Sequence, residues 1–310
     1  MESAANSNNI SPEQWHSRGE YQSLLGHQIF CIDSGQAEPS PLKPTLLLIH
    51  GFPTSSWDWM PIWDTLTTDY RVVALDMLGF GFSDKPNKRN YSIHGQADIV
   101  EALIKQKGLG EFHVLAHDYG DTVAQELLAR QLDGNGGGRW LSCCFLNGGL
   151  FPETHRALIT QKLLLSPIGG LLNRFTGFNK FCRNFSSVFG EATKPSKQEL
   201  ESFWRLINFN NGKHLFHNLI TYISDRIQHR ERWVLALQQS SIPLALINGS
   251  VDPVSGAHMV ARYQDLSCRL DYCAELPLIG HYPQVEDPAQ VSAHYQTFLK
   301  TLIPQRGLIA

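Results

Sequence analysis

The stretch FHVLAHDYG, at residues 112–120, decides the fold of this chain. Its first six residues are mostly apolar and form a run of the length that is typical of a buried strand. Asp118 follows directly, between the small residues Ala116 and Gly120, and a helical pattern continues over Thr122–Gln131. Small residues on both sides let a helix pack closely on the preceding strand, as a sharp turn requires. The stretch therefore predicts a strand, a tight turn that presents Asp118, and a helix.

Apolar runs of the same kind recur on both sides of this stretch. They alternate with helical segments such as Ile93–Lys107, and this alternation predicts an α/β fold with a mostly parallel central sheet flanked by helices. Two segments near 19–25 and 27–33 predict an antiparallel pair before that sheet. The other strands are expected at Thr45–His50, Arg71–Asp76, Ser142–Asn147, Pro243–Asn248 and Arg269–Leu276.

Residues 151–239 interrupt the alternation, because the strand signal disappears and the sequence becomes helical, with aromatic residues spread through it. We expect an inserted helical cap here, and a core formed by residues 1–150 and 240–310. A cap over the carboxyl ends of parallel strands would enclose an apolar pocket. Functional side chains are therefore expected in the loops that follow the strands.

Composition and charge exclude several classes of protein. Lys and Arg number 26 and Asp and Glu number 29 among 310 residues, and no long basic run could bind phosphates, so we expect no nucleic-acid partner. No apolar run approaches the length of a membrane span, and the polar amino-terminal stretch lacks the pattern of a signal peptide, so no membrane association and a cytoplasmic location are expected. No metal-binding spacing occurs, and no metal or cofactor is expected. The partner is a small-molecule substrate, and the chain is a monomer or a homodimer.

Asp118 is the only candidate nucleophile at a strand-to-helix turn. The sequence contains no G-x-S-x-G, and the pattern around Asp118 is that of a nucleophile elbow with Asp in place of Ser. An aspartate at this position could also be a plain helix N-cap. Asp252 follows the predicted strand Pro243–Asn248, and His281 follows the last predicted strand, which is the order of acid and histidine in such a triad.

The turn His50-Gly51-Phe52-Pro53 follows a neighbouring predicted strand. The backbone N–H of Phe52 could point towards the Asp118 carboxylate and, with the N–H of Tyr119, form an oxyanion hole. The same residues would also suit an ordinary turn. We expect His50 to line the substrate pocket.

An aspartate nucleophile suits attack on an sp³ carbon, which displaces a halide or opens an epoxide and leaves an alkyl ester on the enzyme. His281 would then activate water against that ester, and Asp252 would orient His281. The sequence therefore predicts a hydrolase that acts through an alkyl-aspartyl ester.

The elbow His117-Asp118-Tyr119-Gly120, the turn at residues 50–53 and the run at residues 76–86 resemble epoxide hydrolases and haloalkane dehalogenases of the α/β-hydrolase superfamily. This resemblance implies the α/β-hydrolase fold and the alkyl-enzyme route. Over nearly its whole length the chain also resembles the mesoderm-specific transcript family of vertebrates, through WDW at 57–59, NGGLFPETHR at 147–156 and HYPQ at 281–284. The latter resemblance supplies no substrate.

The resemblance also separates the candidate reactions. Haloalkane dehalogenases usually carry Trp after the nucleophile and fluoroacetate dehalogenases carry Arg, whereas this chain has Tyr119. Epoxide hydrolases use two cap tyrosines as acids, and Tyr222 resembles the second. The first has no counterpart, so His155 is the candidate substitute, and Trp204 is expected to line the pocket. Epoxide hydrolysis is therefore favoured, with haloalkane hydrolysis and a non-catalytic binding protein as alternatives.

Overall fold

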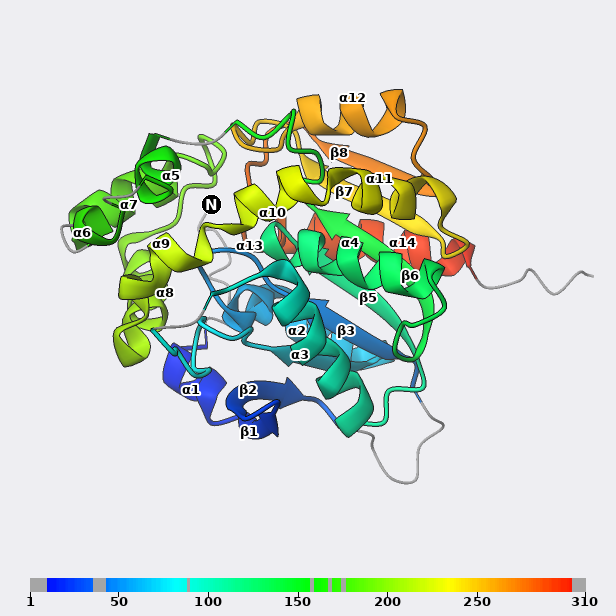
Figure 1. Cartoon of the computed structure of the whole chain (residues 1–310), viewed down its shortest axis with the longest axis horizontal. Coiled ribbons are helices and arrows are strands. Elements are labelled where there is room, and N and C mark those ends of the chain that lie inside the picture. The colour runs from blue at the N-terminus through cyan, green and yellow to red at the C-terminus, as the bar shows by residue number, and fades with distance from the viewer. Residues whose placement is uncertain are drawn as a thin grey trace, which may run out of the picture.

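The structure, a computed structural model, describes residues 10–35, 43–87, 90–156, 159–166, 169–173 and 177–302. Much of the polar amino-terminal stretch, on which the prediction of no signal peptide rests, lies outside these residues. The described chain contains one eight-stranded sheet (Figure 1). Its strands are β1 Gly19–Leu24, β2 His27–Asp33, β3 Thr45–Ile49, β4 Arg71–Leu75, β5 Glu111–His117, β6 Arg139–Leu146, β7 Leu244–Gly249 and β8 Tyr272–Leu276.

The strands lie in the order β1-β2-β4-β3-β5-β6-β7-β8. β1 and β2 form the antiparallel pair that the sequence predicts, and β2 is antiparallel to β4. All other neighbouring strands run parallel. The carboxyl ends of β3, β5, β7 and β8 therefore meet at one edge of the sheet, which is where open parallel sheets bind their ligands.

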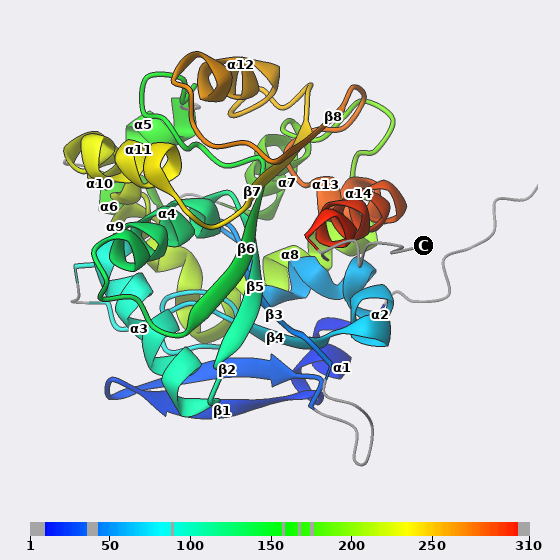
Figure 2. The same cartoon turned by 90° about the vertical axis from the view of Figure 1, so that its right-hand side faces the viewer.

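Helices cover both faces of the sheet (Figure 2). On one face lie α3 Ile93–Gln106, α4 Tyr119–Leu132 and α11 Arg230–Gln239, and on the other lie α2 Met60–Asp69 and α14 Pro288–Thr301. Shorter elements complete the core. They are α1 Pro12–His16, η1 Ser56–Trp59, α12 Ala257–Asp265 and α13 Pro283–Glu286. Of these, α12 packs its buried side chains into the same layer as α3 and α4.

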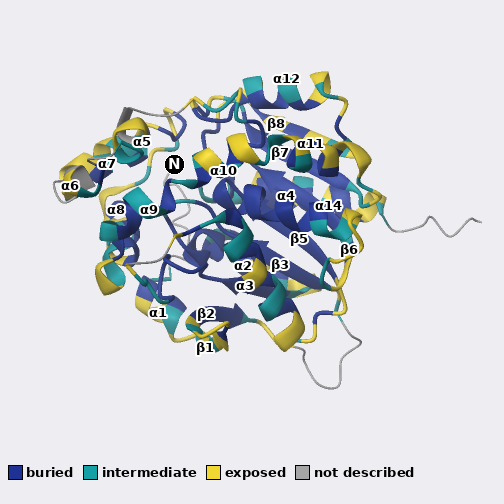
Figure 3. Cartoon of the chain, in the orientation of Figure 1, coloured by how far each residue is buried: buried dark blue, intermediate teal, exposed yellow. Residues whose placement is uncertain are grey.

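The hydrophobic core has two layers, one on each face of the sheet. Along β3, Leu47 and Ile49 pack in the layer under α3 and α4, whereas Leu46 and Leu48 pack in the layer under α2 and α14. This alternation follows from the pleat of a strand, which turns successive side chains to opposite faces. Because both faces are covered, the inner strands are buried along their length (Figure 3). The predicted fold class is confirmed.

A series of helices connects β6 to β7, and those labelled α5 to α9 gather at one end of the molecule, to the left in Figure 1. One of them, α8, begins with a capping box in which Ser196 and Glu199 satisfy each other's backbone N–H. The helical insertion, as we call this segment, consists of α5 Ile159–Leu164, α6 Gly169–Asn173, α7 Phe178–Ser186, α8 Lys197–Asn208, η2 Phe209–Leu215, α9 Phe216–Leu219 and α10 Tyr222–Gln228.

Helix α11 packs against α4 of the core, and the indole of its Trp233 donates a hydrogen bond of 2.9 Å to Glu126. We therefore propose that the cap ends near Gln228, before α11, whereas the sequence suggested residue 239. The division into core and cap stays a prediction. None of the described helices is long and apolar enough to cross a bilayer.

Three predicted element starts differ from the structure by three residues. The last strand begins at Tyr272 and not at Arg269, because Arg269 pairs with Asp271, whose carboxylate accepts the N–H of Leu244. β6 begins three residues early, at Arg139, because Arg139 and Trp140 pair with Glu111 and Phe112 before a register shift that skips Leu141. Helix α4 begins directly after Asp118, without the gap that the sequence suggested.

Candidate active site

Asp118 occupies a strained turn between β5 and α4. Its backbone angles are φ 48° and ψ −104°, in a region that residues other than glycine rarely adopt and that is often found at functional sites. The side chain is 3% exposed. A Cβ at Gly120 would collide with the carbonyl oxygens of Ile49 and His50, at the end of β3. The small residue expected two positions after Asp118 is therefore needed because the helix lies against that strand end.

The turn after β3 supplies one donor to the Asp118 carboxylate. The N–H of Phe52 donates a hydrogen bond of 3.0 Å to Asp118 Oδ2. Tyr119 is the first residue of α4, so its N–H is among those that have no partner within the helix. One donor of the predicted oxyanion hole, the N–H of Phe52, therefore already binds the carboxylate. The second predicted donor, the N–H of Tyr119, follows Asp118 directly in the chain.

His50 lies beneath this turn. Its Nε2 accepts the N–H of Met77 at 3.0 Å, so its Nδ1 carries the proton and donates to Gly51 O at 2.8 Å. Burial lowers the pKa of this ring. Both nitrogens bind backbone groups, so His50 supports the turn, and its place in a pocket wall stays a prediction.

His281 and Asp252 come together at the ends of β8 and β7. His281 Nδ1 lies 2.7 Å from Asp252 Oδ2, and His281 Nε2 lies 3.8 Å from Asp118 Oδ1. Asp252 also accepts hydrogen bonds from the side chain of Asn147 at 3.0 Å and from the backbone N–H of Val254 at 2.7 Å. Such a carboxylate is fixed in position, and it can orient the imidazole and stabilise its protonated form.

The charges of these three groups are coupled. Burial alone would raise the pKa of Asp118, but His281 and Arg226 outweigh it and hold this pKa below its usual range. Burial would lower the pKa of His281, yet the charges of Asp252 and Asp118 raise it well above the usual value. Burial would raise the pKa of Asp252, but the charge of His281 and the hydrogen bonds that Asp252 accepts outweigh it and lower this pKa. The resting site thus favours two carboxylates and an imidazolium.

Arg226 is a site residue that the sequence did not reveal. It lies on α10 and is 1% exposed, and its Nη2 lies 3.8 Å from Asp118 Oδ1 and donates to the backbone oxygen of Asp118 at 3.3 Å. The only signal in the sequence is its spacing of four residues from Tyr222, which places both side chains on one face of a helix. That spacing does not show what this face contacts.

Tyr222 and His155 both lie near the elbow. The Tyr222 ring packs 5.0 Å from the ring of Tyr119 and 5.9 Å from the ring of Phe52. His155 Nδ1 lies 3.4 Å from Arg226 Nη1, and burial lowers the pKa of His155 to about 4. The structure therefore brings the two predicted cap residues close to Asp118 through Phe52, Tyr119 and Arg226.

Trp204 is not brought to this cluster by any contact in the described structure. Its ring lies 5.1 Å from Phe181 and 6.0 Å from Phe178, within the helical insertion, and Lys213 lies over it. Its predicted role as a pocket wall stays a prediction. Among the described residues no cluster of His, Cys, Asp or Glu is arranged to hold a metal ion.

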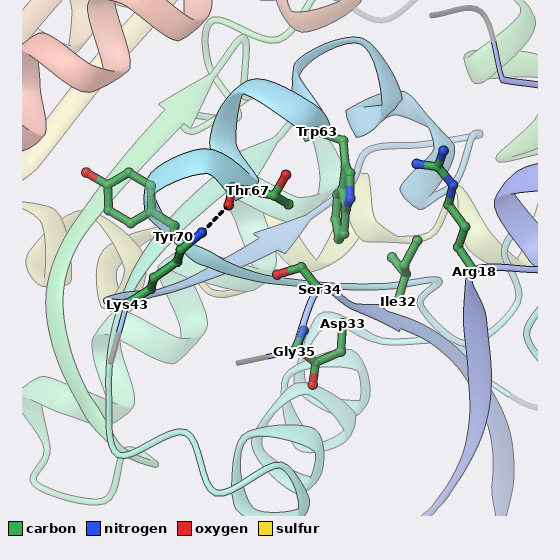
Figure 4. Close-up of a pocket in the computed structure, with 9 residues that line it drawn as sticks. All are labelled: Arg18, Ile32, Asp33, Ser34, Gly35, Lys43, Trp63, Thr67 and Tyr70. Carbon is green, nitrogen blue, oxygen red and sulfur yellow. Dashed lines mark hydrogen bonds between the residues drawn. The ribbon is translucent and has the colours of Figure 1, made fainter. Parts of the chain in front are cut away.

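A surface pocket of about 330 Å³ lies away from the site, beside β2 and α2 (Figure 4). Lys43, on its wall, donates a hydrogen bond of 2.8 Å to the backbone oxygen of Thr67. Its lining includes no residue of the predicted triad, of α10 or of the turn at residues 50–53, which we call the oxyanion turn. The pocket is therefore separate from the candidate active site.

Comparison with known proteins agrees with this fold. Residues 44–288 match the family model described as the alpha/beta hydrolase fold, and the chain belongs to that family. The mesoderm-specific transcript homolog protein of Bos taurus is 44% identical over 304 residues, which cover 94% of this chain and 89% of that protein. The predicted resemblance to this group is thereby confirmed.

Two further relatives are more distant. The putative hydrolase LipZ of Mycobacterium tuberculosis is 36% identical over 278 residues, which cover 90% of this chain and 94% of that protein. A solved structure of a haloalkane dehalogenase variant from Bradyrhizobium elkanii superimposes with a TM-score of 0.75 at 21% identity, over 92% of this chain and 96% of that chain. At that identity the likeness shows the fold alone.

Proposed function

We propose that this protein is a hydrolase that forms a covalent ester on Asp118 with a small, largely apolar substrate, and that the favoured substrate is an epoxide. The observation that carries this proposal is the position of the Asp118 carboxylate. The N–H of Phe52 holds Oδ2, while Oδ1 lies 3.8 Å from His281 Nε2. One oxygen is therefore fixed and the other remains available to attack carbon.

In the first step Asp118 Oδ1 forms a bond to an epoxide carbon, and the bond from that carbon to the epoxide oxygen breaks. The electron pair goes to this oxygen, which takes a proton from Tyr222. Burial raises the pKa of Tyr222, so the phenol stays protonated at neutral pH and can donate. Its contacts with Phe52 and Tyr119 place its ring over the oxyanion turn.

In the second step water attacks the carbonyl carbon of the Asp118 ester, and His281 takes the water's proton. The carbonyl C–O bond of the ester then breaks, the alcohol oxygen takes that proton, and the proton of the new Asp118 carboxyl group returns to His281. The proton that His281 released when the ester formed restores Tyr222. The first step has removed the charge of Asp118, which is one cause of the raised pKa of His281. That pKa therefore falls when the ester forms, and the imidazole becomes available as a base. The N–H groups of Phe52 and Tyr119 stabilise the oxyanion, and Asp252 keeps His281 in place.

Hydrolysis of a carbon–halogen bond is the second candidate, and the buried cation of Arg226 beside Asp118 Oδ1 favours it because a departing halide is an anion. Tyr119 stands against it, because its phenol replaces the indole found in haloalkane dehalogenases. A non-catalytic binding protein would have no need for a buried His281–Asp252 pair held at 2.7 Å.

The test is to trap the ester in a His281→Gln variant, which lacks the base of the second step. The variant is incubated with a panel of epoxides and a panel of haloalkanes, and its intact mass is measured. We expect an adduct that maps to Asp118 and is absent from the matched double variant His281→Gln with Asp118→Asn. No adduct from either panel, with folded protein, would favour the binding role.

A further inference from the structure

Arg226 carries a buried charge whose hydrogen bonds are incomplete. Its Nε donates to Thr122 Oγ1 at 2.8 Å, its Nη2 to the backbone oxygen of Asp118 and its Nη1 to His155 Nδ1. These three hydrogen bonds use three of the five N–H groups of the guanidinium, and the Tyr222 hydroxyl, a neutral acceptor, lies close enough to take a fourth. The only carboxylate paired with it there is Asp118, at 3.8 Å, which is too far for a hydrogen bond.

His155 adds a further donor to this place. Arg226 can only donate, so His155 Nδ1 must accept, and the proton of the neutral ring is then on Nε2. His155 Nε2 is buried and has no hydrogen-bond partner in the described structure. A buried donor without an acceptor is costly, which indicates that something binds there during function.

The charge of the site changes during the proposed reaction. In the resting protein the negative charge of Asp118 balances the positive charge of Arg226. While Asp118 becomes an ester this charge develops on the leaving atom, before Tyr222 protonates it where that atom is an epoxide oxygen. Without an anion beside it, the buried cation of Arg226 would be costly in free energy. A site that holds the departing charge beside Arg226 removes this cost.

We propose that Arg226 and His155 form an anion site that receives the negative charge leaving Asp118, either an epoxide oxygen or a halide. This inference rests on the proposed function. It also replaces the missing first tyrosine, because the guanidinium and the His155 Nε2–H take the place of its hydroxyl beside Tyr222.

Two further contacts hold the guanidinium ready. It lies 4.5 Å over the ring of Tyr222, in a cation–π contact. The backbone of Gly149 passes so close that a Cβ there would collide with Arg226 Nη1 and lie 3.1 Å from His155 Nδ1. The donors are therefore fixed before any anion arrives, which is what electrostatic stabilisation of a transition state requires.

The test uses bromide as a probe and needs no knowledge of the substrate. An Asp118→Asn variant has the neutral charge of the ester, so its site should bind bromide more tightly than the site of the wild-type protein, by roughly tenfold or more. Binding is followed by amide chemical shifts at constant ionic strength, with gluconate as the balancing salt. Acetate is titrated in parallel.

Variants of Arg226 in the Asp118→Asn protein identify the cation that binds. Arg226→Gln should weaken bromide binding roughly tenfold, whereas Arg226→Lys, the matched control that keeps the charge, should retain most of it. His281 is also cationic nearby, so undiminished binding in Arg226→Gln would place the anion there and overturn the inference. Acetate binding much more tightly than bromide would also overturn it, in favour of a carboxylate carried by the substrate.

The outcome is separable from that of the trapping experiment. Bromide binding that depends on Arg226, without any adduct in His281→Gln, would establish an anion site at Arg226 and count against the covalent mechanism. An adduct on Asp118 together with bromide binding that ignores Arg226 would refute the anion site alone.

Discussion

At the residue scale, the site depends on a few side chains whose charges influence one another. Asp118 is held in a strained backbone conformation, and its carboxylate lies between the N–H of Phe52 and the two cations of His281 and Arg226. Removing any one charge changes the pKa values of the others, because buried charges are poorly screened. The predictions at this scale therefore concern proton positions.

Replacing Tyr222 with Phe tests its role as proton donor. In the His281→Gln background, Tyr222→Phe should slow ester formation from epoxides by roughly 10²–10⁴-fold, because the departing oxygen loses its acid. Ester formation from haloalkanes should change little, since a halide needs no proton. The rate at which the adduct appears in the mass spectrum measures ester formation with each of the two substrate classes. Equal slowing with both substrates would show that Tyr222 only packs against the elbow.

The charge of Asp118 should control the pKa of His281. In Asp118→Asn this pKa should fall below its value in the wild-type protein, because one of the two anions that raise it is gone. It should stay above the usual histidine value, because Asp252 remains 2.7 Å away. Titration of the labelled imidazole by NMR measures both values. An unchanged pKa would contradict the idea that ester formation makes His281 a base.

At the scale of elements, the site forms where the strand ends meet and where α10 reaches the elbow. The strand ends could be predicted from sequence, because apolar runs and the small residues around Asp118 are local patterns. They place Asp118, Asp252 and His281 at the ends of strands, and the fold brings these three residues together. Arg226 could not be found in this way, because its role depends on how α10 packs on the core.

The close approach of α4 and β3 predicts a specific effect of a methyl group. Gly120→Ala should destabilise the protein by about 1–3 kcal/mol, because the new Cβ would collide with the carbonyl oxygens of Ile49 and His50. Alanine otherwise favours a helix, so the sign is informative. Gly110→Ala is the matched control, since no atom lies within 4 Å of a Cβ there. Urea unfolding measures the stability of both variants. Equal stabilities of Gly120→Ala and Gly110→Ala would mean that the elbow has more room than the structure shows.

At the scale of the whole molecule, two hydrophobic layers hold the sheet, and several buried polar groups tie its strands to one another. His113, within β5, is one of them, and its Nδ1 lies 2.8 Å from Ser142 Oγ on β6. Burial lowers the pKa of His113 to about 4. The native state must keep this ring neutral, whereas the unfolded chain can protonate it.

Stability should consequently fall in mild acid. A histidine with a lowered native pKa supports folding above its unfolded pKa near 6.5, and this support is lost as pH falls towards 4. The protonation of His113 alone should lower the free energy of unfolding by roughly 2 kcal/mol between pH 7 and pH 5. Urea unfolding of wild type and of His113→Gln at both pH values measures it. The variant should show the smaller loss, and an identical loss would mean that His113 is not the group responsible.

The covalent ester on Asp118 is tested most directly by single-turnover hydrolysis in heavy-oxygen water, with wild-type protein and a reagent that labels the His281→Gln variant. Water attacks the carbonyl carbon of the ester, so the heavy oxygen should enter the Asp118 carboxylate and be found in the peptide that contains Asp118. In that first turnover the product should carry oxygen from the enzyme. Heavy oxygen in the product alone, with none in that peptide, would show that water attacks the substrate directly and would contradict a covalent aspartyl ester.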